Sequence, residues 1–381
     1  MSKVQKFATK LLHVGVETDK YTGAVSVPIY QTSTFHQQID KPQEYEYSRS
    51  GNPTRKALET VIAELEGGIA GFAFASGIAA ISTALLLFGQ GDHILAPNDV
   101  YGGTYRLLSK ACGRWGIEHS FIDTTDLSQL DKAVRPNTKA IVLESPSNPL
   151  LKVSDLPAIC AWAKARGIVT IVDNTFMTPY LQRPLEFGAD IVVHSATKFL
   201  AGHSDLVAGL VVTNDEKLAK ELYFLQNALG AILGPQDCWL TMRGIKTLKV
   251  RMDYSEKAAM AIATQLASHP KIKAVHYPGL PSHPGHELLK KQASGFGAVL
   301  SFEAASPELA KQIMSKVKLP VVAVSLGGVE SILSYPVLMS HAAIEPHVRQ
   351  ELGISDALLR LSVGLEDADD LLADLLSAME E

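Results

Sequence analysis

Short apolar runs recur along the middle of the chain, and segments with a helical pattern separate several of them. Each run has about the length of a strand that is buried on both faces, which is typical of a parallel sheet covered by helices. We therefore predict an α/β protein with a central, mostly parallel sheet. The expected strands are Phe72–Ala75, Ile94–Ala96, Ile141–Leu143, Ile168–Val172, Ile191–Val193 and Leu210–Val212, and the clearest helices are Gly77–Phe88 and Leu156–Arg166.

The N-terminal part of the chain lacks this alternation. Residues 1–55 show little periodicity and contain several turn-forming residues, so we expect an extended arm there. Asn52-Pro53 then predicts the start of a helix, because Asn is a good N-cap and Pro suits the first helical turn. Apolar residues at helical spacing follow, and Gly67-Gly68 predicts its end.

The pattern changes again after about residue 245. A long helical stretch over 245–268 precedes expected strands near 298–302 and 323–325, and the chain ends on an amphipathic helix with Leu372, Leu375, Leu376 and Met379 on one face. We therefore divide the chain into an N-terminal arm (1–55), an α/β domain that binds a ligand (56–245) and a smaller α+β domain (246–381).

Composition excludes several classes of protein. Among 381 residues, 46% are hydrophobic and 20% are charged, which is typical of a folded globular chain. The net charge of −5 leaves no basic surplus for nucleic acid, and the most apolar stretch, 78–88, is shorter than the ~20 residues that span a bilayer. The three cysteines, Cys112, Cys160 and Cys238, lack CxxC spacing, which favours a reducing, cytoplasmic location.

The strongest chemical signal is a lysine and an aspartate, each at the end of an expected strand. Lys198 closely follows the strand 191–193, and Asp173 ends the strand that begins at residue 168. A lone lysine there also suits a solvent-exposed surface, but ligands of open α/β sheets gather at the carboxyl ends of strands. Pyridoxal phosphate needs this pair, since the lysine forms its Schiff base and the carboxylate keeps its pyridine nitrogen protonated.

Donors for the phosphate group of such a cofactor are also present. Ser76-Gly77-Ile78 joins an expected strand to a helix, where free backbone N–H groups favour an anion, although a tight turn uses the same residues. Ser195 and Thr197 add hydroxyl groups near Lys198. Tyr47 and Arg49 add further groups suited to phosphate oxygens.

These motifs, taken together, resemble the Cys/Met-metabolism family of fold-type-I pyridoxal-phosphate enzymes, which includes cystathionine β-lyases, γ-lyases and γ-synthases. The resemblance runs over nearly the whole chain in the order of the family. The segments that carry it are Tyr47–Thr54, Ser76–Ala80, Asp99–Gly103, Glu144–Pro149, Val172–Asn174, His194–Lys198 and Ser325–Gly328.

The resemblance implies a role for each matching residue. Lys198 would hold the cofactor, Asp173 would pair with the pyridinium nitrogen, and Tyr101 would stack on the ring and help to move protons. Five residues would bind the phosphate from the same chain: Ser76, Gly77, Ile78, Ser195 and Thr197. Tyr47 and Arg49 would reach the phosphate of a neighbouring subunit, which implies an active dimer, usually paired into a homotetramer.

The substrate side of the site is implied in the same way. Arg360 resembles the arginine that binds the substrate carboxylate, and Ser325 and Asn148 would lie near it. Val324 occupies the position where many γ-acting members carry a glutamate. An apolar residue there leaves no carboxylate for the distal end of the substrate, which favours β- over γ-elimination, although Val324 also suits simple wall packing.

The sequence therefore predicts a carbon–sulfur lyase that cleaves L-cystathionine to homocysteine, pyruvate and ammonia. A γ-lyase, a cystathionine γ-synthase and a non-catalytic binding protein that kept the fold are the alternatives. His194, His203 and His341 stand in no HxxxH or HExxH frame, so we expect no metal.

Overall fold

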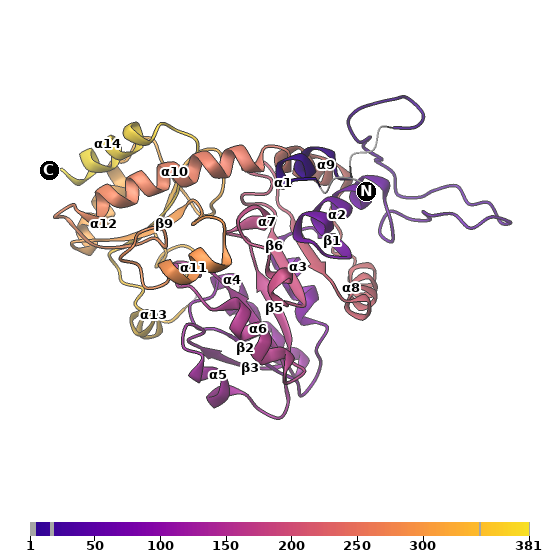
Figure 1. Ribbon diagram of the computed structural model, residues 1–381, viewed down its shortest axis with the longest axis horizontal. Coiled ribbons are helices and arrows are strands. Elements are labelled where there is room, and N and C mark those ends of the chain that lie inside the picture. Colours follow the sequence, from indigo (N-terminus) through magenta and orange to yellow (C-terminus); the bar gives the residue numbers. More distant parts are fainter. Residues whose placement is uncertain (1–4, 16–18, 343, 381) are drawn as a thin grey trace.

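The computed structural model describes residues 5–15, 19–342 and 344–380. Residues 1–4 and 16–18 of the expected arm, and residues 343 and 381 of the expected C-terminal domain, lie outside this described part. Figure 1 shows an elongated molecule in which the C-terminal elements and the arm lie at opposite ends.

The centre of the molecule is a seven-stranded sheet with the strand order β1-β7-β6-β5-β4-β2-β3. Strand β7 runs antiparallel to both of its neighbours, and the pairs from β6 to β3 are parallel, so the sheet is mostly parallel as predicted. The strands are β1 (Ala70–Phe74), β2 (His93–Pro97), β3 (Glu118–Ile122), β4 (Thr138–Glu144), β5 (Val169–Asp173), β6 (Ile191–Ser195) and β7 (Gly209–Thr213).

The unbroken apolar runs have a direct structural cause, because helices cover both faces of this sheet. In β4, Ala140 and Val142 pack into one apolar cluster with helix α3, whereas Ile141 and Leu143 pack into another with helix α6. Alternate residues of a strand point to opposite faces, so both sets are buried. The helices of this part of the chain are α2 (Pro53–Glu66), α3 (Gly77–Leu85), α4 (Gly102–Arg106), α5 (Ser128–Ala133), α6 (Leu156–Lys164), α7 (Thr178–Leu181), α8 (Glu216–Leu229) and α9 (Pro235–Ile245). The short π-helix Leu107–Ala111 and the 3₁₀-helices Cys112–Trp115 and Pro184–Phe187 complete it.

A second, five-stranded sheet has the order β10-β11-β12-β9-β8 and is antiparallel except for the β10–β11 pair. Its apolar core also includes residues of α10, α12 and α14, which lie together in Figure 1. The elements are α10 (Leu248–Ala267), β8 (Ile272–His276), α11 (His286–Gln292), β9 (Val299–Ala304), α12 (Pro307–Lys316), β10 (Val321–Val322), β11 (Ile332–Ser334), α13 (Pro346–Leu352), β12 (Leu358–Ser362) and α14 (Ala368–Met379).

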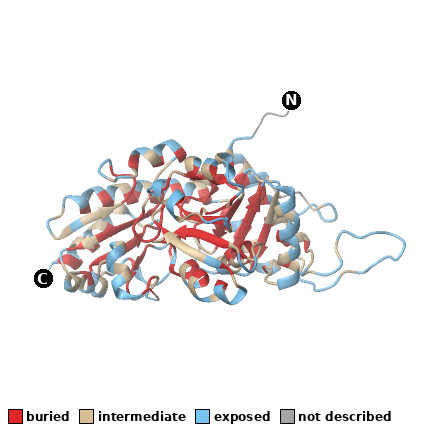
Figure 2. Cartoon of the chain, turned by 90° about the horizontal axis from the view of Figure 1, so that it is seen from below, coloured by how far each residue is buried: buried red, intermediate tan, exposed pale blue. Residues whose placement is uncertain are grey.

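The arm is extended over residues 19–52, where the structure contains no helix and only isolated bridges such as Thr34–Tyr47. It projects from the body as a largely exposed loop in Figure 2. One short helix, α1 (Phe7–His13), precedes it and was not predicted. Helix α2 begins and ends as predicted: Asn52 Oδ1 accepts from Thr54 N, and Gly67 ends the helix at φ +76°.

Some details of the sequence prediction are wrong. The expected strand at 323–325 is irregular backbone, because β10 ends at Val322 and Ser325 adopts φ +93°. The helix expected over 245–268 is confirmed as the single helix α10, which begins at Leu248, after a break at Lys246 and Thr247, and ends at Ala267. Strand β3 was missed, because its partly exposed sequence EHSFI at the sheet edge has no apolar run. On α14 the buried residues are Leu371, Leu375, Ala378 and Met379, while Leu372 and Leu376 are only partly buried.

Candidate active site

A cavity of about 550 Å³ lies between the strand ends of the seven-stranded sheet and the loop that follows β10. Glu144, Asp173 and Ser195, which end β4, β5 and β6, contribute to its wall, as do Val324 and Ser325 from the loop. The structure thus brings together twelve of the residues singled out from the sequence: Ser76, Gly77, Ile78, Tyr101, Asn148, Asp173, Ser195, Thr197, Lys198, Val324, Ser325 and Arg360.

Lys198 lies just beyond β6, with its side-chain amine directed at the second half of the chain. Its Nζ donates a hydrogen bond of 2.5 Å to Ser325 Oγ. Burial and the nearby positive charge of Arg360 lower the pKa of Lys198 to about 8. Near physiological pH the neutral fraction of this amine is therefore far larger than that of an ordinary lysine, which favours its use as a nucleophile or proton acceptor.

Asp173 ends β5 on the floor of the cavity. Its Oδ1 accepts hydrogen bonds from the Thr175 hydroxyl (2.5 Å) and the Thr175 backbone N–H (3.0 Å). Burial raises the pKa of Asp173, while these hydrogen bonds and the nearby His194 oppose the rise. Within the described part of the chain, Oδ2 has no hydrogen-bond partner, so it remains available to a donor from a ligand.

The first turn of α3 forms another side of the cavity. The N–H groups of Gly77 and Ile78 have no acceptor within the described residues, and the helix dipole adds partial positive charge there. Ser76 Oγ accepts from Ala79 N, which leaves its own proton free to be donated. A Cβ on Gly77 would lie 2.7 Å from Ser195 Cβ, so only glycine lets Ser195 approach this turn.

Thr197 lines the same cavity but already has backbone partners. Its Oγ1 accepts from Ala208 N at 2.9 Å and lies 3.3 Å from Ala208 O. The hydroxyl is thus less free to donate than that of Ser195, which has no protein partner within the described residues.

Tyr101 is 43% exposed and stands at the N-terminus of α4. Its ring lies against Gly103, where a Cβ would come within 2.4 Å of Tyr101 Cε1. Its backbone N–H donates to Glu144 Oε2 at 3.1 Å, and Glu144 Oε1 accepts from Asn148 N at 2.8 Å. Glu144 therefore connects the Tyr101 loop to the Asn148 loop, and burial together with the neighbouring Asp173 raises its pKa well above the usual range.

Arg360 reaches the cavity from β12 although only 2% of the residue is exposed. One terminal nitrogen donates to Asn148 Oδ1 at 2.8 Å, and the other donates to Ser325 O at 2.6 Å. Burial lowers the pKa of Arg360 to about 10. Among the described residues, its Nε has no hydrogen-bond partner, so the guanidinium keeps hydrogen-bonding capacity for a carboxylate.

Sequence reasoning assigned no role to five polar residues that line the cavity, namely Thr104, Arg106, Glu144, Thr175 and Ser340. Glu144 ends β4 directly beside Asp173 in the sheet, and this position at the strand end was a usable signal. Thr175 follows Asp173 by two positions in the pattern of an Asx turn. The position of Arg106 in the cavity wall depends on the direction in which α4 runs, and no sequence pattern indicated it.

Tyr47 and Arg49 do not line this cavity. They lie on a separate exposed concave surface with Gln31 and Ile232. Arg49 Nη1 donates to the carbonyl and side-chain oxygens of Asn227, both at 2.9 Å. Their expected role in a neighbouring subunit therefore stays a prediction.

The three histidines considered as metal ligands have other partners. His194 Nε2 pairs with buried Glu66 at 2.6 Å, His203 with Ala201 O, and His341 with Asn148 O. No group of three His, Cys, Asp or Glu residues suited to a metal occurs in the described part of the chain. Nor does any helix within residues 5–15, 19–342 and 344–380 have the length and apolarity to cross a membrane.

These groups fit pyridoxal phosphate on chemical grounds. The cavity contains a partly neutral lysine amine, a carboxylate with a free oxygen, an anion-binding helix N-terminus and an aromatic ring. The glycine at position 77 keeps open the approach between α3 and Ser195 that a Cβ would fill. Fold and cavity thus define a pyridoxal-phosphate enzyme of fold type I.

Comparison with known proteins agrees with this class. Residues 8–380 match the model of the Cys/Met metabolism PLP-dependent enzyme family, and the chain belongs to that family. It is 56% identical to a cystathionine β-lyase of Bacillus subtilis (98% of this chain, 96% of the relative) and 53% identical to a cystathionine γ-lyase of the same organism (98% and 99%). A solved cystathionine γ-lyase from Lactobacillus plantarum, complexed with L-serine, superposes with a TM-score of 0.96 at 49% identity, covering 98% of each chain.

Proposed function

We propose that the chain cleaves L-cystathionine by α,β-elimination, which consumes one water and gives homocysteine, pyruvate and ammonia. The observation that carries this proposal is the meeting of Lys198, Asp173 and Arg360 in one cavity. The similarity to proteins named cystathionine β-lyase, at 55–56% identity, supports the same substrate.

Each residue has a defined task in this proposal. Bound pyridoxal phosphate supplies the electron sink for the electron pair left when the substrate Cα loses its proton. Asp173 would pair with the pyridine nitrogen through its free Oδ2, and Ser76, Gly77, Ile78, Ser195 and Thr197 would hold the phosphate. Tyr101 would supply the aromatic ring that stacks on the cofactor.

Lys198 carries the proton. Its amine would hold pyridoxal phosphate when the cofactor is bound, and once the substrate is in place it would remove the Cα proton and deliver a proton to the departing thiolate. The lowered pKa of about 8 suits an amine that must accept and release a proton near neutral pH. Arg360, with Asn148 and Ser325 beside it, binds the substrate carboxylate and holds Cα within reach of Lys198.

Val324 supports β- over γ-elimination. Its side chain lies in the cavity wall one residue before Ser325, and 63% of the residue is exposed. The γ-route needs further proton transfers at Cβ, and an apolar side chain cannot assist them. The γ-lyase activity remains the second candidate, because the chain is 53% identical to a protein of that name.

Purified protein with L-cystathionine tests both candidates when pyruvate and 2-oxobutyrate are separated by chromatography. Mostly pyruvate supports the β-lyase and the role of Val324. Mostly 2-oxobutyrate makes the γ-lyase the better description. The absence of both products, in protein that binds the cofactor, contradicts both and favours a synthase.

The proposal extends to assembly and organisation. Residues 56–245 bind the cofactor, residues 246–381 contribute the substrate carboxylate site, and the arm (1–55) contacts a neighbouring subunit in a homotetramer built from active dimers in the cytoplasm. The exposure of the apolar arm residues Tyr21, Val25 and Ile39 supports an arm that is covered by another copy. Light scattering of the purified protein measures the assembly directly.

A further inference from the structure

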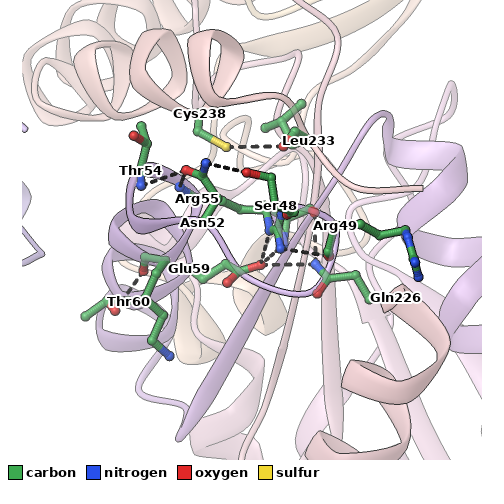
Figure 3. Close-up of polar contacts among 12 residues, drawn as sticks. Ser48, Arg49, Asn52, Thr54, Arg55, Glu59, Thr60, Gln226, Leu233 and Cys238 are labelled. Carbon is green, nitrogen blue, oxygen red and sulfur yellow. Dashed lines mark hydrogen bonds and ion pairs between the residues drawn. The ribbon is translucent and has the colours of Figure 1, made fainter. Parts of the chain in front are cut away.

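A buried arginine of helix α2, Arg55, binds the backbone of the turn that carries Tyr47 and Arg49 (Figure 3). Arg55 donates from Nη1 to Ser48 O at 2.5 Å and from Nη2 to Arg49 O at 3.0 Å. Its two terminal nitrogens thus bind consecutive carbonyl groups of the turn. The Arg49 side chain points away from Arg55 in Figure 3 and lies on the exposed surface.

The same arginine faces Glu59, one helical turn further along α2. The two groups form an ion pair with 3.5 Å between Arg55 Nε and Glu59 Oε1. Glu59 Oε1 also accepts from Ala73 N and from Gln226 Nε2, each at 3.0 Å. Ala73 belongs to β1, so Glu59 is itself held by the edge of the central sheet.

This pair is costly to bury, which argues for a positional task. Arg55 is 2% exposed, and the Glu59 side chain is 12% exposed. Burial raises the pKa of Glu59, and the charge of Arg55 is the largest opposing influence. A buried ion pair contributes little net stability compared with apolar packing, but it imposes a fixed geometry on its partners.

We propose that Arg55 and Glu59 are positioning residues, which lock the 47–51 turn so that Tyr47 and Arg49 reach the cofactor phosphate held by a second copy of this chain. The inference rests on the proposed function of Tyr47 and Arg49 as phosphate ligands across the subunit boundary. It assigns the pair an effect on the partner's cavity and none on the cavity of its own chain.

Mixed assemblies separate these two effects. One copy retains Lys198, and a large excess of a Lys198→Ala copy ensures that nearly every Lys198-bearing copy is paired with it. Borohydride fixes pyridoxal phosphate onto Lys198, and mass spectrometry of that copy measures the fixed fraction against cofactor concentration. The fixed fraction reports on the cavity of the Lys198-bearing copy only, and its measurement needs no catalytic turnover.

Arg55→Lys keeps the charge but replaces the two terminal nitrogens, each of which binds one carbonyl group, by a single ammonium nitrogen. When Arg55→Lys is placed in the Lys198→Ala copy, we expect cofactor binding at the unaltered Lys198-bearing copy to weaken at least about tenfold. Placed in the Lys198-bearing copy, it leaves the binding unchanged, because that cavity then receives the arm of the unaltered copy. Lys56→Ala, an exposed neighbour on α2, is the matched control and changes neither arrangement.

Three results would overturn the inference. Cofactor binding could weaken only when Arg55→Lys is in the Lys198-bearing copy, it could weaken in both arrangements, or it could weaken in neither. Arg49→Ala in the Lys198→Ala copy tests the underlying function: if it has no effect, Tyr47 and Arg49 do not act across subunits. If Arg49→Ala weakens binding and Arg55→Lys does not, the positioning role alone fails. Should Arg55→Lys fold poorly, Glu59→Gln removes the charge at nearly the same shape and carries the same expectation.

Discussion

Lys198 Nζ and Ser325 Oγ are joined by a hydrogen bond of 2.5 Å, which connects the end of the seven-stranded sheet to the loop after β10. The contact is close because Gly327 permits it: a Cβ there would lie 2.6 Å from Phe199 N. Ser325 is held at φ +93°, a region that side chains rarely adopt, and its carbonyl binds Arg360. The amine of Lys198 and the guanidinium of Arg360 are thus both held by Ser325.

The first prediction concerns Lys198 itself. Lys198→Ala should lower pyruvate release from L-cystathionine by about 10³-fold or more, because no other amine in the cavity can take the Cα proton. Pyridoxal phosphate should still bind without being fixed by borohydride. Lys152→Ala, which removes a lysine outside the cavity, is a suitable control, and full activity of Lys198→Ala would contradict the mechanism.

The pKa of Lys198 predicts how attachment of the cofactor depends on pH. Only the neutral amine attacks an aldehyde, so below pH 8 the rate of borohydride-trapped attachment to cofactor-free protein should rise about tenfold per pH unit and level off above it. Arg360→Gln removes a positive charge that favours the neutral amine, so the midpoint should move to higher pH. A midpoint near the ordinary lysine value in the unaltered protein would disprove the assignment.

Arg360 is expected to govern substrate affinity more than cofactor binding. Arg360→Lys keeps a charge but loses the planar fork, so the KM for L-cystathionine should rise about ten- to a hundredfold. The absorbance of the bound cofactor should stay the same, which separates this effect from a collapse of the cavity. An unchanged KM would remove Arg360 from the carboxylate site.

Val324 is expected to influence the product ratio. Val324→Glu places a carboxylate where proton movements at the distal carbons can be assisted, so the ratio of 2-oxobutyrate to pyruvate should increase about tenfold. Val324→Leu, which stays apolar, is the matched control. Chromatography of the keto acids decides, and equal ratios in the two variants would show that Val324 only packs in the wall.

Gly77 tests the close approach between α3 and Ser195. Gly77→Ala puts a Cβ 2.7 Å from Ser195 Cβ, and this overpacking should lower the free energy of unfolding by about 1–3 kcal/mol. The phosphate end of the cofactor should also bind more weakly. Gly113→Ala, where a Cβ would meet nothing within 4 Å, is the control for thermal unfolding and cofactor titration.

Much of the large sheet was predictable from local patterns, as was the part of the cavity around Lys198, Asp173 and the start of α3. The other predicted cavity residues, Tyr101, Asn148, Val324, Ser325 and Arg360, were expected from the resemblance to the family. Buried strands of a parallel sheet are apolar on both faces, so runs such as Ile191–Val193 are visible in the sequence. Asp173 follows such a run directly, and Lys198 lies a few residues beyond one. Asn52 and Gly67 marked the ends of α2, because capping depends on neighbouring residues only. The edge strand β3 escaped, since a partly exposed strand needs no apolar run.

Tertiary structure decided what no local pattern contains. Lys198 and Ser325 are hydrogen-bonded although they lie 127 positions apart in the sequence, and Arg360 and Asn148 are hydrogen-bonded although they lie 212 positions apart. Both contacts exist only once the two sheets are folded and packed. The lowered pKa of Lys198 follows from that burial and from the charge of Arg360. The sequence by itself therefore determined which residue types stand at the strand ends, while the packing of the two sheets decided which groups share a cavity and in which protonation state, because burial and charge proximity are properties of the folded chain.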